Sequence, residues 1–140
     1  MIYSMSIPIA KVLKRKQIWT WIWLCWTLLI IYLSITSIPT IVIPTLIGID
    51  KIGHIVFYGL HTFWGFLSIE NDFRPLSNNK NWVKIFVSAI FALFLGLVLE
   101  FYQSTLAHRV FDYYDLLANT IGVILTVILI VVLNNRLLKN

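Results

Sequence analysis

Charged residues are scarce in this sequence. Only 12% of the 140 residues are Asp, Glu, Lys or Arg, whereas 59% are hydrophobic, and the mean hydropathy is +0.86. Soluble domains carry about 25% charged residues on average, so we expect this chain to lie in a membrane. Residues 1–140 leave room for one domain, built from a few apolar spans of about 20 residues each.

Cysteine and the common catalytic motifs are also nearly absent. Cys25 is the only cysteine, so an intramolecular disulfide is excluded. The chain has no H-E-x-x-H zinc motif, no G-x-S-x-G nucleophile elbow and no P-loop. We therefore predict no cofactor and no metal, although a group of side chains at the outer ends of the helices offers chemically suitable metal ligands. These are Asp50, His54, Asp112 and Asp115.

Long apolar runs are the main feature that is present. They predict an all-α fold, a polytopic membrane bundle with four transmembrane helices. The spans are 18–36, 52–69, 82–99 and 116–133. A basic segment before the first run resembles the start of a signal peptide. Because the run is longer than a typical signal core and no A-x-A-like cleavage site follows it, we predict an uncleaved first helix.

Positive charges predict the orientation, since Lys and Arg near the ends of spans stay on the cytoplasmic side. Nine of the eleven fall on one side: Lys11, Lys14, Arg15, Lys16, Arg74, Lys80, Lys84, Arg136 and Lys139. Only Lys51 and Arg109 fall on the other. Both termini are therefore predicted to be cytoplasmic. The same distribution explains the net charge of +5 without nucleic acid, which we do not expect as a partner.

Polar residues gather at the outer ends of the last three predicted helices. On the second helix they recur every four positions from Asp50 to Tyr58, and on the fourth they step by three, four and three from Asp112 to Gly122. Such spacing places them on one face of each helix. Three helices can thus direct polar faces into one outward-opening pocket. The predicted site residues are Asp50, Lys51, His54, Tyr58, Glu100, Gln103, Arg109, Asp112, Asp115 and Asn119.

The residue types suggest roles for some members of this group. Arg109 and Lys51 suit phosphate or carboxylate, and Arg offers a bidentate fork. Lys51 equally suits an interfacial cation that contacts headgroups. Arg109 suits that role less, because it lies beside two carboxylates against the general charge distribution. His54 is placed to act as an acid or a base. The deeper residues His61 and Asn119 are expected to form interhelical hydrogen bonds, because polar groups inside a membrane need partners.

The order of these residues along the chain resembles the VanZ-like family of small bacterial membrane proteins. The resemblance rests on Asp-Lys-x-x-His-x-x-x-Tyr from Asp50, Glu-x-x-Gln from Glu100, and Arg-x-x-Asp-x-x-Asp-x-x-x-Asn-x-x-Gly from Arg109, within residues 33–126. It implies a multi-pass protein of the bacterial inner membrane. It also implies a link to tolerance of glycopeptide antibiotics such as teicoplanin, but no particular reaction. One departure is Thr126, where the resemblance leads us to expect a smaller, glycine-like residue.

Three functional hypotheses follow. The first is a site that binds a charged envelope molecule, either a lipid headgroup or a lipid-linked cell-wall precursor. The second is an integral-membrane enzyme acting on a lipid-linked substrate, with His54 as acid or base; no nucleophile is evident, so the sequence leaves the catalytic residues unknown. The third is a structural or assembly partner in which an ion network of Arg109, Glu100, Asp112 and Asp115 only joins the third and fourth helices. Membrane lipids are expected partners, and the sequence leaves the oligomeric state open.

Overall fold

The computed structural model describes residues 9–36, 47–69, 79–106 and 110–137. Within these ranges the regular structure consists of the helices α1 (Ile9–Ile35), α2 (Ile47–Ile69), α3 (Asn79–Ser104) and α4 (Tyr113–Leu137). Each helix contains a stretch that is long and apolar enough to cross a membrane. The prediction of an all-α fold with four membrane-spanning helices is confirmed.

The helices extend beyond the apolar spans that the sequence predicts. α2 begins at Ile47 instead of residue 52, α3 continues to Ser104 instead of ending at residue 99, and α4 begins at Tyr113 instead of residue 116. The added turns carry five of the predicted site residues, Asp50, Lys51, Glu100, Gln103 and Asp115. Hydropathy alone would end the spans before these residues, but in the fold their side chains find partners on neighbouring helices, so the helical backbone continues.

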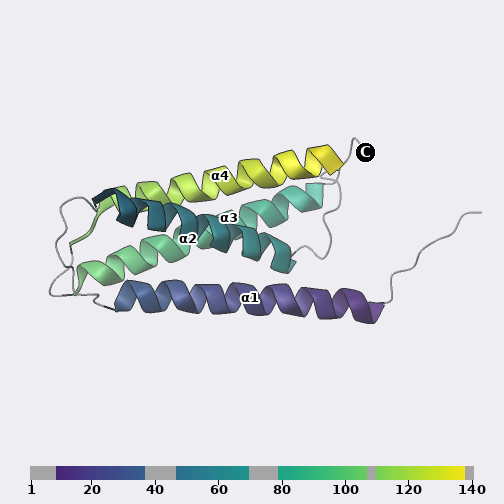
Figure 1. Cartoon of the computed structure of the whole chain (residues 1–140), viewed down its shortest axis with the longest axis horizontal. Helices are drawn as coiled ribbons and strands as arrows, with labels where there is room; N and C mark the ends of the chain where they lie inside the picture. Colours follow the sequence, from purple (N-terminus) through teal and green to yellow (C-terminus); the bar gives the residue numbers. More distant parts are fainter. Residues whose placement is uncertain (1–8, 37–46, 70–78, 107–109, 138–140) are drawn as a thin grey trace, which may run out of the picture.

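Successive helices run antiparallel, so that the start of α1 and the end of α4 lie at the same end of the bundle (Figure 1). At the other end α1 and α3 finish while α2 and α4 begin. We call this second end the polar end, because the described members of the predicted site lie toward it.

α2 is the central helix of the bundle and packs against the other three, most extensively against α4. The α2 and α4 backbones approach closely, since a Cβ atom on Gly122 would overlap the carbonyl group of Ile55. Deeper along the same contact, the Thr126 hydroxyl donates a hydrogen bond to the carbonyl oxygen of Gly59 (3.1 Å). Small residues permit such close packing in membranes, and Thr126 fits this role although a smaller, glycine-like residue was expected there.

A second interhelical contact involves the buried His61 of α2. Its Nε2 atom lies 3.0 Å from the Thr27 hydroxyl of α1, and that hydroxyl donates to the Trp23 carbonyl oxygen (2.8 Å). The imidazole also stacks on Phe91 of α3, with ring centroids 5.8 Å apart. The interhelical hydrogen bond expected of His61 is therefore present, and it joins α2 to α1.

The outward faces of the helices are apolar. Large side chains such as Trp21, Phe86, Phe94 and Leu125 are exposed, whereas soluble monomers rarely expose extensive apolar surface. In a bilayer these faces would contact lipid tails. Cys25 is exposed as well.

Candidate functional site

The site is built where α2 and α4 begin. Asp50 lies in the first turn of α2 and Asp115 in the first turn of α4. Asp112 precedes α4 and caps it, since its Oδ1 atom accepts a hydrogen bond from the backbone NH of Tyr114 (2.7 Å). Asp is one of the preferred residues at this capping position. Two helix starts thus bring three carboxylates together.

Lys51 lies among these carboxylates. Its Nζ atom donates to Asp112 Oδ2 at 2.5 Å and to Asp115 Oδ1, and Asp50 Oδ2 lies 3.4 Å away. The hydrogen bond from Lys51 lowers the pKa of the Asp112 carboxyl below its usual range. This ion network joins α2 to α4, whereas the structural hypothesis placed such a network between the third and fourth helices. Within this network, the Lys51 ammonium group donates its hydrogen bonds to carboxylates of the protein itself.

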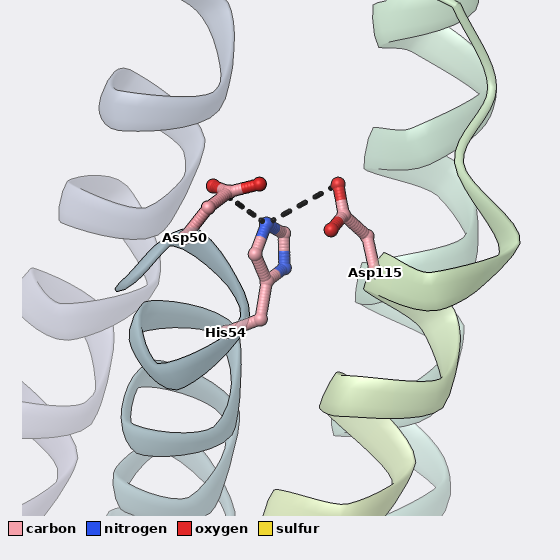
Figure 2. A group of neighbouring side chains, drawn as sticks. All are labelled: Asp50, His54 and Asp115. Atoms are coloured by element: carbon pink, nitrogen blue, oxygen red, sulfur yellow. Dashed lines mark ion pairs between the residues drawn. The ribbon is translucent and has the colours of Figure 1, made fainter. Parts of the chain in front are cut away.

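His54 lies one turn deeper on α2. Its Nδ1 atom is 2.9 Å from Asn119 Oδ1 on α4, which is the kind of interhelical partner expected for Asn119. Its Nε2 atom faces two carboxylate oxygens, Asp115 Oδ2 at 3.5 Å and Asp50 Oδ1 at 3.9 Å (Figure 2). The ring is parallel to that of buried Tyr58, with centroids 6.2 Å apart. Asn119 therefore fixes the His54 ring through Nδ1, and Nε2 points toward the two carboxylates.

Glu100 and Gln103 of α3 hold the surrounding helices in place. Glu100 is only 3% exposed, and its Oε1 atom accepts a hydrogen bond from the backbone NH of Asp112 (2.6 Å). Gln103 Nε2 donates to the Ser34 carbonyl oxygen on α1 (3.0 Å). The first contact connects α3 to the start of α4, and the second connects α3 to α1.

A pocket of about 240 Å³ lies between α1, α2 and α3 at the polar end. Ile30, Leu33 and Phe57 form much of its apolar wall, while Asp50 and His54 contribute polar atoms. The remaining lining residues are Ser34, Ile49, Gly53, Tyr58 and Gln103. Sequence reasoning missed the contribution of α1, because its lining side chains are mostly apolar and resemble any lipid-facing position.

The structure brings the described site residues together around two linked features, the pocket and the ion network. Lys51, Asp112 and Asp115 belong to the network, and Asp50 and His54 border both. Arg109 lies outside the described residues. Among the described side chains at the polar end, the carboxylates of Asp50, Asp112 and Asp115 surround the single cation Lys51, so this group carries an excess of negative charge.

Four helices long enough to cross a bilayer, with a polar cluster at one end, define a multi-pass membrane protein. The sequence pattern of the VanZ/LLP1 family matches residues 2–134. The chain therefore belongs to the VanZ/LLP1 family, as the motif resemblance predicts. No curated protein and no solved structure matches it significantly.

Proposed function

We propose that this membrane protein binds a charged molecule of the bacterial envelope, either a lipid headgroup or a lipid-linked cell-wall precursor, in the pocket at its polar end. The observation that carries the proposal is that both apolar and polar side chains line this pocket. Ile30, Leu33 and Phe57 offer apolar surface, and Asp50 and His54 offer polar atoms at the same cavity. An amphiphile presents both kinds of surface, so it matches the pocket better than a wholly polar solute does.

The charges of the site favour a headgroup that carries an amine or hydroxyls. Lys51 is bonded to Asp112 and Asp115, which leaves the carboxylates in excess among the described side chains. Asp50 is the most exposed of the ion-paired carboxylates, with 60% of its side chain accessible, and it lines the pocket. An ammonium group beside Asp50 would gain a charge-assisted hydrogen bond. Contact of Arg109 with phosphate remains part of the proposal.

The proposal places the polar end on the outer face of the inner membrane, following the distribution of Lys and Arg. Val110 adjoins the site and is 86% exposed, so it is a suitable labelling position. In a Cys25→Ser background, a thiol introduced by Val110→Cys should react with a membrane-impermeant maleimide on intact spheroplasts. Labelling that requires permeabilisation would contradict this orientation.

Binding can be tested by filling the pocket. Gly53 lines it, and a Cβ atom there would meet no atom within 4 Å, so Gly53→Leu adds volume without displacing the backbone. Gly48→Leu is the matched control, because Gly48 also lies on α2, also has open space, and does not line the pocket.

The probes are phosphatidylethanolamine, which carries an amine, and phosphatidylglycerol, which does not. Native mass spectrometry from detergent should show preferential retention of phosphatidylethanolamine by the natural protein and by Gly48→Leu, with retention lost in Gly53→Leu. Equal retention by all three proteins would contradict binding in this pocket.

An enzymatic role is the second candidate, favoured by the imidazole of His54 beside Asp115 at the pocket wall. A general acid or base contributes about 10²–10⁴-fold to a rate, whereas one hydrogen bond in a binding site contributes about 0.5–1.5 kcal/mol. For a binding protein, His54→Gln should reduce teicoplanin tolerance of expressing cells only modestly. Turnover of a lipid-linked substrate that His54→Gln abolishes, with lipid binding kept, would instead establish the enzyme.

A further inference from the structure

Asp50 and Asp115 each direct their two carboxylate oxygens at different partners. Asp50 Oδ2 and Asp115 Oδ1 face Lys51. The other two oxygens, Asp50 Oδ1 and Asp115 Oδ2, face His54 Nε2. We propose that these two oxygens, together with His54 Nε2, form a binding site for one divalent transition-metal ion. This inference does not depend on the proposed lipid ligand.

The ligand atoms already lie close to the spacing that such an ion needs. One atom from each of Asp50, His54 and Asp115 falls within 4.8 Å of the other two. Zinc–ligand bonds of about 2.0–2.2 Å in a tetrahedron separate neighbouring ligand atoms by roughly 3.3–3.6 Å. The His54 to Asp115 distance is 3.5 Å and the His54 to Asp50 distance is 3.9 Å. Both distances from His54 thus lie within a few tenths of an ångström of this range, and the 60% exposed Asp50 side chain can turn to bring its oxygen atom nearer to Asp115.

The hydrogen bond between His54 and Asn119 is a separate observation that indicates a cation. The Asn119 Oδ1 atom is an acceptor, so His54 Nδ1 donates to it, and Nε2 is the nitrogen left for a metal ion. His54 Nε2 faces two carboxylate oxygens, and a metal ion between these three atoms would bond to all of them. Metal-binding histidines usually have their second nitrogen fixed by such an outer partner. Asn119 is only 2% exposed and is therefore well fixed.

The charge of the cluster fits a divalent ion. Asp50, Asp112 and Asp115 contribute three negative charges and Lys51 one positive charge, which leaves two negative charges when His54 is neutral. A divalent ion neutralises this remainder. Because Lys51 and the ion would use different oxygen atoms, they need not exclude each other.

The donor set indicates which ions to expect. Imidazole nitrogen suits zinc and its first-row neighbours, whereas magnesium and calcium prefer oxygen alone. Three protein ligands also leave a coordination position open, which is typical of sites that bind a further molecule. Asp50 and His54 line the pocket, so a molecule in the pocket could reach that position.

Metal binding is tested with the purified full chain and Zn²⁺ or Co²⁺ alone, without lipid. Zn²⁺ affinity is measured by calorimetry with Mg²⁺ as the comparison ion, and Co²⁺ absorption bands report the coordination. We expect Zn²⁺ to bind with one equivalent per chain and Mg²⁺ to bind more weakly. Asp115→Asn should lower the Zn²⁺ affinity by more than about 100-fold, since loss of a ligand should exceed the 10–100-fold effect of losing an outer partner.

Asp112→Asn is the matched control, because it removes the same charge from the Lys51 network without removing a proposed ligand atom. It should have a much smaller effect than Asp115→Asn. If both variants lose Zn²⁺ affinity to a similar extent, the ion is attracted only by the overall negative charge, and the proposed metal site is wrong.

Two further measurements keep the test decisive if Asp115→Asn fails to fold. His54→Gln should remove the imidazole signal from the zinc X-ray absorption spectrum, and Asn119→Ala should weaken Zn²⁺ binding by about 10–100-fold. Absence of Zn²⁺ binding to the natural protein, or an unchanged imidazole signal in His54→Gln, would refute the proposal.

Discussion

The contact between α2 and α4 is made in two different ways along its length. At the polar end, Lys51 reaches across to Asp112 and Asp115, and His54 reaches to Asn119. Deeper in the bundle, Gly59 and Gly122 let the backbones approach directly, with Thr126 bonded to the Gly59 carbonyl oxygen. The deep contact sets the distance between the helices, and the polar contact uses that distance to assemble charged groups. Fold and site should therefore respond differently to substitution.

The largest effect is expected from Gly122→Leu in the deep contact. A Cβ at this position would overlap the Ile55 carbonyl group, which belongs to the backbone and cannot rotate away. Overpacking a core costs about 1–3 kcal/mol and occasionally more, and we expect a loss of more than about 3 kcal/mol here. The measurement is the free energy of unfolding in SDS titrations. Gly48→Leu is the control with open space, and an equal loss in both variants would contradict a specific backbone contact.

An intermediate effect is expected from Lys51→Met at the polar end. Removal of the Lys51 ammonium group leaves the Asp115 carboxylate, whose side chain is only 9% exposed, without its partner. A buried polar group left unpaired costs about 1–3 kcal/mol, and we expect a loss within this range because the network is partly open to solvent. Asp50→Asn should cost less than about 1 kcal/mol, since its contact with Lys51 is exposed. Equal losses would indicate that Lys51 acts through its general charge.

A smaller effect is expected from Thr126→Val, which keeps the shape of the side chain but removes its hydroxyl. The lost hydrogen bond to Gly59 joins two membrane helices, and such bonds contribute about 0.6 kcal/mol on average. The same SDS titration measures it. A loss as large as that of Gly122→Leu would mean that the hydroxyl, and not the close backbone approach, sets the helix spacing.

The smallest effect concerns acid pH and Asp112. The Lys51 hydrogen bond lowers the pKa of Asp112 in the folded protein, so this contribution is fully present above the usual carboxyl range and is lost as the pH falls through the lowered pKa. The melting temperature should therefore fall in acid. Asp112→Asn retains a good helix cap and should reduce the slope of this fall. An unchanged slope would contradict a coupled Lys51–Asp112 pair.

Much of the fold was predictable, because long apolar runs have few alternatives to membrane helices. The shared face of Asp50 and His54 followed from helical spacing, and the need of buried Asn119 for a partner followed from its membrane depth. The partner of Lys51 was not predictable, since the choice between a ligand and Asp115 depends on how far α2 lies from α4. The pocket wall from α1 was missed for another reason: Ile30 and Leu33 carry no polar signal.

The shared direction of α2 and α4 has a consequence for the electrostatics of the site. One antiparallel helix separates α2 from α4, so both begin at the same end of the bundle, and both place an aspartate in their first turn. The positive end of each helix dipole thus faces the carboxylates, where it stabilises a negative group by about 0.3–1 kcal/mol. Part of the attraction that gathers Asp50 and Asp115 comes from the direction of the backbone, which no side-chain substitution at Lys51 removes. Adding or deleting one crossing between α2 and α4 would reverse one dipole and turn this attraction into repulsion.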